Sequence, residues 1–178
     1  AYNNINFGGG SGATLVTITP KVGTGTAAGD IVLYQNVAQL SGTQIDCIIK
    51  TRSLTGGSFT NYDQPLVTDG STFNSNDPRF FSPQFTFNAG GGTAIFDFQF
   101  ILGNSYNNAT NTGTPVVLQN VRVNTYDIDG NGTGSSNQVN EFDGFTTSEL
   151  SSATTIQAPT FNTTTNLTRY RSNVSTNN

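Results

Sequence analysis

The clearest β-strand signal in this sequence is Gly90-Gly91-Gly92-Thr93-Ala94-Ile95-Phe96-Asp97-Phe98-Gln99-Phe100-Ile101-Leu102. Successive side chains of a strand point to opposite faces, so Phe96, Phe98 and Phe100 share one face of the expected strand 93–102. The three glycines favour a hairpin turn before it. We interpret the phenylalanine face as core packing, because a platform that stacks sugars more often uses Trp or Tyr and the chain has no Trp.

Similar alternation recurs along the chain, and no window has a long helical pattern. Turn residues separate the apolar runs, and Pro83 marks an edge strand or the start of one. A polar loop is expected over 103–114, and a β-bulge near Gln119-Asn120. The sequence therefore predicts an all-β fold, an antiparallel β-sandwich or jelly roll of about 8–10 strands. The other expected strands are 13–19, 31–39, 43–53, 81–87, 115–126, 139–145 and 151–158.

The composition limits the classes of partner. Only 10% of the 178 residues are charged, the net charge is −4 and the sequence pI is about 4.4. The few Lys and Arg residues are scattered, which argues against nucleic-acid binding. No apolar run approaches the roughly 18–20 residues of a membrane span, so none is expected. The chain does not open with a signal-peptide pattern, and we expect any secretion signal to have been removed or never included.

The absence of histidine from the sequence excludes a Cys–His pair, a Ser/His/Asp triad and His-ligated zinc. Cys47 is the single cysteine, and Ile45, Cys47 and Ile49 share one strand face, so we expect a buried thiol that packs as a small apolar group. A glycosidase would need two carboxylates about 5–10 Å apart, such as Asp97 with Asp46 or Glu141. With so few acidic residues we do not expect an enzyme.

An acidic run, Asp127-Ile128-Asp129-Gly130-Asn131-Gly132, is the best candidate for a metal site. Carboxylates and amides at alternate positions before a glycine match the first half of an EF-hand loop, whose oxygens hold Ca²⁺. The second half does not match, because Gln138 stands at the twelfth position and Gly134 at the eighth. The alternative is a solvated turn in which Asp and Asn side chains cap their own backbone.

The two ends differ from the middle of the chain. We expect three parts: an N-terminal arm with a Gly-rich hinge over 1–12, a β-sandwich domain over 13–158, and a Thr/Asn-rich strand or tail over 159–178. The arm has a short β-compatible sequence before its glycines. It either adds a strand to the sheet of a neighbouring copy or is a disordered terminus.

Glycosylation is possible at five Asn-x-Ser/Thr sequons if the host has the machinery. Asn131 is at once a sequon and a calcium candidate, and these two uses conflict. The acceptor candidates are Asn108, Asn131, Asn162, Asn166 and Asn173.

Several segments together resemble a known family. They are residues 39–46 (a Gly-Thr-Gln-Ile-Asp ending), the strand 93–102, Tyr126-Asp127-Ile128-Asp129-Gly130, and Glu141-Phe142-Asp143-Gly144-Phe145. Over roughly 30–158 the chain is similar to a β-sandwich module of large bacterial cell-surface proteins and adhesins, of the DIDG type. The segment 131–140 is longer than this family pattern.

The resemblance implies an extracellular module with adhesive or structural duty, a stabilising Ca²⁺ and no enzymatic reaction. Carried onto this sequence, it makes Asp127, Asp129 and Glu141 the first ligand candidates. The second set is Asp46, Asn131 and Asp143.

Two functions are weighed against each other. The first is an extracellular or cell-surface structural or adhesive protein, a calcium-stabilised filament subunit that joins copies of itself, or other surface proteins, by strand exchange of the N-terminal arm. The alternative is a calcium-dependent carbohydrate-binding module with glycans as partners. Ice binding is disfavoured, because no regular Thr-x-Thr ladder is present.

Overall fold

A computed structural model describes residues 5–7, 16–61, 81–119, 121, 123, 139–144, 147, 150, 152 and 156–171. The chain forms two compact units, 1–121 and 122–178, and each is described by itself. The predicted domain boundaries at 12/13 and 158/159 stay predictions. In the described parts every regular element is a strand, and no helix there is long and apolar enough to cross a membrane.

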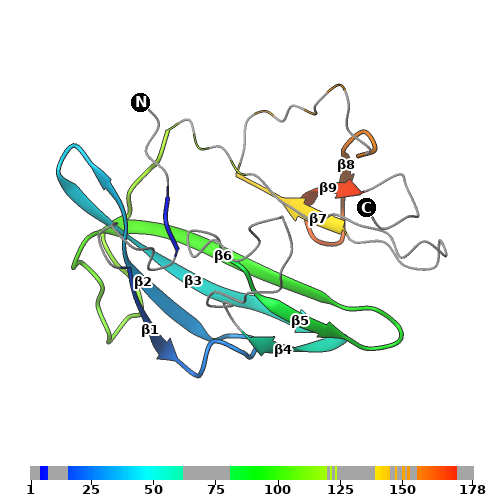
Figure 1. The fold of residues 1–178 in the computed structure, drawn as a ribbon, viewed down its shortest axis with the longest axis horizontal. Coiled ribbons are helices and arrows are strands. Elements are labelled where there is room, and N and C mark those ends of the chain that lie inside the picture. Colours follow the sequence, from blue (N-terminus) through cyan, green and yellow to red (C-terminus); the bar gives the residue numbers. More distant parts are fainter. Residues whose placement is uncertain are drawn as a thin grey trace, which may run out of the picture. The chain divides into compact units, whose positions relative to one another are not determined.

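The centre of the first unit is a four-stranded antiparallel sheet in the order β1-β2-β3-β6 (Figure 1). Its longest pairing joins β3 to β6, and β6 coincides with the strand predicted from the alternating phenylalanines. β2 and β3 contain the predicted strands 31–39 and 43–53. The bounds are β1 Thr17–Val22, β2 Ile31–Leu40, β3 Thr43–Thr55 and β6 Thr93–Leu102.

Strand register divides the side chains of this sheet between two faces. Ile49 lies opposite Phe98 and Cys47 opposite Phe100, so the phenylalanines of β6 lie on the face of Ile45, Cys47 and Ile49. The predicted core packing of these phenylalanines is only partly met, since Phe98 is 43% exposed. That face carries the larger buried cluster, which includes Val32, Tyr34 and Val37 of β2, and we call it the arm face. The opposite face carries a smaller cluster around Leu33, Ile48 and Ile101, and we call it the loop face.

A second layer begins where β3 ends. β4 (Gly57–Asn61) pairs with β5 (Gln84–Phe87), and β5 starts directly after Pro83, as predicted. At Gly56 the backbone has φ +66°, and a Cβ there would lie 2.1 Å from the carbonyl oxygen of Gly91, so only glycine allows this bend. The bend brings Phe59 of β4 back onto Phe96 of β6, with ring centroids 5.6 Å apart.

Layering of the β4–β5 pair on the arm face agrees with a β-sandwich, and the prediction of an antiparallel all-β fold is confirmed. The finer jelly-roll topology stays a prediction.

The polar loop predicted at 103–114 packs back onto the loop face. It is anchored at both ends, because Gly103 N–H donates to Gln44 O (2.8 Å) and Leu102 N–H donates to Thr114 O (2.9 Å). Tyr106 lies against the Leu33–Ile48–Ile101 cluster.

The second unit has a small antiparallel sheet in the order β7-β9-β8. β7 (Val139–Phe142) occupies the first part of the predicted strand 139–145, while β8 (Thr160–Asn162) and β9 (Leu167–Arg171) come from the Thr/Asn-rich end. Of the two alternatives for that end, a pairing strand is found over 160–171.

Three strand predictions need correction. β1 begins at Thr17 and continues to Val22, beyond the predicted end at 19, while positions 13–15 of this prediction lie outside the described residues. Of the predicted strand 115–126, the described residues form only one isolated bridge, between Pro115 and Ile101, and the N–H of Thr114 donates to Ser105 Oγ instead of continuing the ladder with β6. Of the predicted strand 151–158, the described part has one bridge residue, Ile156, and its neighbour Gln157 donates its N–H to Arg171 O.

Candidate functional site: the seat of the N-terminal arm

Residues 5–7 of the N-terminal arm lie on the arm face of their own sheet (Figure 1). Ile5 and Phe7 pack against its buried cluster. The Phe7 ring makes edge-to-face contacts with Tyr34, Phe81 and Phe98 at centroid distances of 5.7, 6.2 and 5.9 Å. Such pairs add about 0.5–1.5 kcal/mol each beyond the area that they bury. Phe7 is therefore an anchor for the arm.

The arm is also held by its backbone. Asn6 N–H donates to the carbonyl oxygen of Val37 at 2.7 Å. β1 pairs with β2 only as far as Gln35, opposite Thr17, so Val37 lies beyond the end of β1 on that edge. The arm thus uses a stretch of β2 edge that β1 does not cover. We call Tyr34, Val37, Phe81 and Phe98 the arm seat.

A bulge in β2 shapes this seat. The β2–β3 register shifts between Tyr34 and Ala38, and Asn36 within the bulge has φ +65°. A non-glycine residue rarely adopts this conformation, although Asn tolerates it better than most. The bulge ends regular pairing and leaves the Val37 carbonyl to the arm.

Asp46 stabilises the bulge from within β3. It is fully buried, and its Oδ1 accepts hydrogen bonds from Asn36 N–H (2.8 Å) and Gln44 Nε2 (2.7 Å). Its Oδ2 accepts one from Asn104 N–H (3.0 Å) at the start of the 103–114 loop. A buried carboxylate is costly unless it is compensated, and these three donors compensate it. One side chain therefore fixes both the arm seat and the loop of the opposite face.

The calcium candidates are distributed over different parts of the chain. Asp127, Asp129 and Asn131 lie outside the described residues. Asp46 belongs to the first unit, whereas Glu141 and Asp143 belong to the second. Within the described ranges, no group of three or more His, Cys, Asp and Glu side chains comes together as a metal site would require.

Glu141 stabilises the turn between β8 and β9. Its carboxylate accepts hydrogen bonds from Asn162 Nδ2 (2.8 Å), Thr165 Oγ1 (2.5 Å) and Arg169 Nε (2.5 Å). Burial alone would raise the pKa of Glu141, but these hydrogen bonds and the positive charge of Arg169 outweigh it and lower the pKa. Arg169 also opposes a second cation at this carboxylate.

Asp143 is exposed, and its Oδ1 accepts a hydrogen bond from the N–H of Gly144 (2.7 Å). This is the backbone-capping arrangement expected of a solvated turn. For calcium binding, the prediction therefore depends mainly on the run 127–131.

The sequons have different surroundings. Asn108 is exposed in the 103–114 loop and Asn166 is exposed in the β8–β9 turn. Asn162 is half-buried and its amide donates to Glu141, so a glycan on that nitrogen would compete with this contact. Asn131 and Asn173 lie outside the described residues.

Cys47 is buried in the arm face, as predicted. Burial raises the pKa of its thiol far above the usual range, with a smaller contribution from the nearby Asp46 charge. The thiol is therefore neutral and shielded, and it does not provide a nucleophile.

Sequence reasoning missed the arm seat. It identified Phe7 and the hinge as an arm but did not connect them with Tyr34 or Val37. Asn36, a residue type that tolerates positive φ, interrupts the apolar alternation of this strand and was the available signal for a bulge.

Comparison with protein-family models, curated proteins and solved structures gave no significant match. The resemblance to a bacterial surface module therefore depends only on the residues quoted for it.

Proposed function

We propose that this chain is an extracellular structural or adhesive protein, a filament subunit that joins copies of itself by exchange of the N-terminal arm. The observation that supports it most directly is the docking of Ile5, Asn6 and Phe7 on the chain's own sheet. The docked segment is followed by Gly8-Gly9-Gly10-Ser11-Gly12, a sequence typical of a flexible tether.

Exchange between copies costs little contact energy. An arm that leaves its own seat and enters the seat of a neighbour makes the same ring contacts and the same backbone hydrogen bond there. The balance between the two states then depends on tether strain and protein concentration rather than on new interactions. Both partners are already complementary, since every arm fits every seat.

The geometry of such an exchange favours a polymer. The arm of one subunit and the seat of the next are different surfaces, so the contact is heterologous. A growing assembly therefore keeps a free arm at one end and a free seat at the other. Unless the rotation between subunits closes a ring, the product is an open filament.

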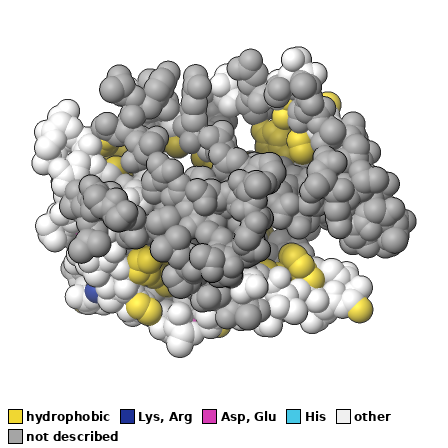
Figure 2. Space-filling model, viewed as in Figure 1, with side chains coloured by type: hydrophobic (Ala, Val, Ile, Leu, Met, Phe, Trp, Pro, Cys, Tyr) yellow, Lys and Arg dark blue, Asp and Glu magenta, His cyan; other side chains and the backbone are white. Residues whose placement is uncertain are grey.

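Low charge suits an extracellular structural role. Figure 2 shows hydrophobic side chains among the described residues on the face that it views. With a net charge of −4 over 178 residues, long-range repulsion between copies is weak.

Electron microscopy of two matched variants tests the proposal. Phe7→Ala removes the anchor of the arm, whereas Phe87→Ala removes a phenylalanine that is 53% exposed and contacts the Phe85 ring. We expect filaments from the parent chain and from Phe87→Ala, and dispersed folded subunits from Phe7→Ala and from a chain lacking residues 1–10. Normal filaments without the arm would overturn the proposal.

A free arm provides a second test. A synthetic peptide of residues 1–12 should bind the arm-deleted chain and block its reaction with full-length subunits. The same peptide carrying Phe7→Ala should bind at least about tenfold more weakly, given the roughly 1.5–3 kcal/mol gained by burying a phenylalanine. Equal binding of the two peptides would show that the seat does not recognise Phe7.

The proposal includes a stabilising Ca²⁺ ion held by the acidic run 127–131. Asp127, Asp129 and Asn131 supply the oxygen donors that Ca²⁺ prefers. Adding a chelator should lower the thermal midpoint of the parent chain, and the double variant Asp127→Asn with Asp129→Asn should have that lower midpoint already. A midpoint that calcium leaves unchanged would contradict it.

A further inference from the structure

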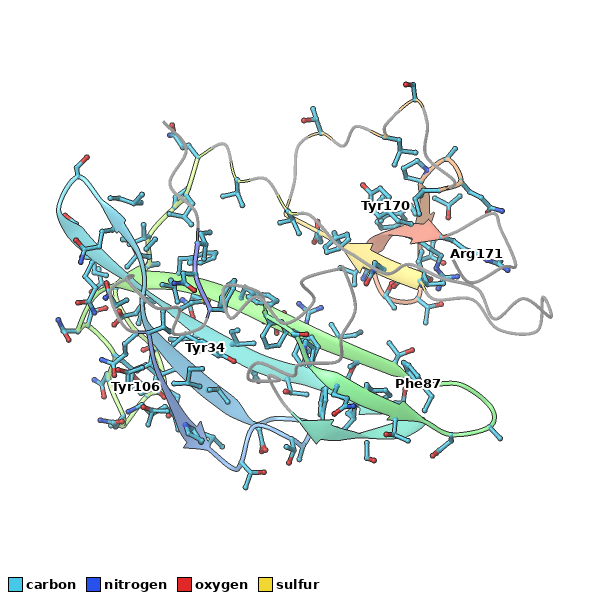
Figure 3. The ribbon with its side chains drawn as sticks, viewed as in Figure 1. Tyr34, Phe87, Tyr106, Tyr170 and Arg171 are labelled. Atoms are coloured by element: carbon cyan, nitrogen blue, oxygen red, sulfur yellow. The ribbon has the colours of Figure 1, made fainter. Side chains whose placement is uncertain are left out.

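The loop face carries a groove that neither the arm nor calcium uses. It has a volume of about 390 Å³ and lies between the sheet and the tip of the 103–114 loop. Its floor is apolar, from Ile31 and Ile48, and its rim includes Lys50, Gln99, Thr110 and Thr112. Figure 3 labels Tyr106, which belongs to the loop that bounds the groove, and Tyr34, which lies on the arm face of the same sheet.

The loop wall is held by its own hydrogen bonds. Asn107 N–H donates to Thr112 O at 2.7 Å, and Asn111 N–H donates to Asn107 O at 2.8 Å. The Tyr106 hydroxyl bonds to Asn111 Oδ1 at 2.8 Å, and the hydroxyls of Thr110 and Thr112 lie 2.8 Å apart. A wall fixed in this way loses little conformational entropy when a ligand binds.

The groove contains one carboxylate and one ammonium group with different surroundings. The guanidinium of Arg52 already donates hydrogen bonds to both carboxylate oxygens of Asp97. Lys50 lies opposite Asp97 in the strand register, yet its ammonium has no ion-pair partner among the described residues. The groove therefore offers a positive charge to a ligand, and its negative charge is neutralised.

We propose that this groove binds a saccharide unit that carries a carboxylate, the chemistry of a uronic acid. Threonine hydroxyls and the Gln99 amide supply both donors and acceptors, which a sugar ring with several hydroxyls requires. The two isoleucines give the C–H face of the ring an apolar contact. Lys50 binds the carboxylate, and one or two rings match the volume, which lies at the small end of ligand sites.

This site does not depend on the proposed assembly. It occupies the face opposite the arm seat and uses none of its residues. It also differs from a calcium-dependent sugar site, because the lining offers only the Asp97 carboxylate and Arg52 already neutralises it.

The test titrates the isotope-labelled full-length chain, at a concentration that keeps it dispersed, with methyl glucuronoside and with neutral methyl glucoside, followed by amide NMR. We expect saturable shifts at Gln99 and at 110–112, with a Kd on the order of 1 mM for the uronide. The neutral glycoside should bind about two- to fivefold more weakly, as a solvent-exposed ion pair predicts.

The two lysines of the sequence provide a matched control. Lys21 lies over the Tyr106 ring at 5.1 Å and does not line the groove, whereas Lys50 does. Lys50→Gln should remove the preference for the uronide, and Lys21→Gln should keep it.

Three results would overturn the proposal. They are no saturable shift with either glycoside up to about 50 mM, equal effects of the two lysine variants, and stronger shifts from triglycine, which would indicate a peptide site.

Discussion

The two faces of the β1-β2-β3-β6 sheet are covered in different ways. On the arm face, part of the cover is a segment that precedes a run of glycines and is held by the aromatic anchor Phe7 and by a backbone hydrogen bond from Asn6 to Val37. On the loop face, the cover is a loop that continues directly from β6 and is fixed by its own hydrogen bonds.

Because of this difference, we expect the N-terminal arm to exchange between copies and the 103–114 loop to stay in place. Releasing the arm breaks a few contacts and leaves the strands paired, so the cost is local. Releasing the 103–114 loop would break its bonds to Gln44 and Leu102 and expose Leu33 and Ile101. We therefore expect assembly to use the arm face and a preformed binding site to use the loop face.

The largest effect on stability is expected at Asp46, which connects the two faces. Asp46→Ala removes three hydrogen bonds to a fully buried carboxylate, so the free energy of unfolding should fall by about 3 kcal/mol in urea denaturation. Asp46→Asn, which keeps the size and one acceptor oxygen, should lose less. A loss below about 0.5 kcal/mol in Asp46→Ala would show that the bulge does not need this carboxylate.

The contrast between the faces can be sharpened with Cys47 as a reporter. Its buried thiol lies on the arm face, where its pKa is raised by burial, so it should react slowly with thiol reagents in the native chain. Phe7→Ala should speed this reaction by about tenfold through local opening of the arm face, whereas Tyr106→Ala should leave it nearly unchanged. If Phe7→Ala and Tyr106→Ala sped the reaction of Cys47 equally, the arm and the 103–114 loop would not cover the two faces independently.

The smallest effect is expected in the second unit, where Glu141 has a role like that of Asp46. Its pKa is lower in the folded state than in the unfolded state, so its contribution to stability is present above the unfolded pKa. It is lost as the pH falls through the folded pKa.

The matched variant is Glu141→Gln. It should lose about 1–2 kcal/mol near neutral pH and approach the parent chain in acid, as followed by the fluorescence of Tyr170 or by exchange of the β9 amides. If the difference in unfolding free energy between Glu141→Gln and the parent chain did not change with pH, the stabilisation would not come from the ionised carboxylate of Glu141.

Local patterns in the sequence predicted which segments are strands but not which strands pair. Within the described residues 84–102, the hairpin expected at Gly90-Gly91-Gly92 is not formed, because β5 pairs with β4 and β6 pairs with the distant β3. β6 and the burial of Cys47 followed from strict alternation, since a strand buried on one side must alternate. The predicted strand 115–126 failed at its described start, because the spacing of Val117 and Val121 says nothing about whether an edge is available for pairing. Val117 is in fact 87% exposed.

Contacts that depend on distant residues were not predictable from one sequence. The arm seat joins residue 6 to residue 37 and residue 7 to residue 98, and no short pattern connects them. Asp46 is a metal-ligand candidate only through the family resemblance. Only the positions of Asn36 and Asn104 revealed the backbone donors that its burial requires.

The most direct test of arm exchange is a cross-link between subunits that each carry one new cysteine. One preparation carries Asn6→Cys in the arm, and the other carries Gln39→Cys, an exposed residue two positions after Val37. The native Cys47 is buried, so it should not react with the reagent.

The two preparations are mixed, assembled and treated with a short bifunctional thiol reagent. Exchange predicts covalent dimers that contain one chain of each kind. Filaments that give no mixed dimers, while a chain carrying both cysteines cross-links only to itself, would contradict it.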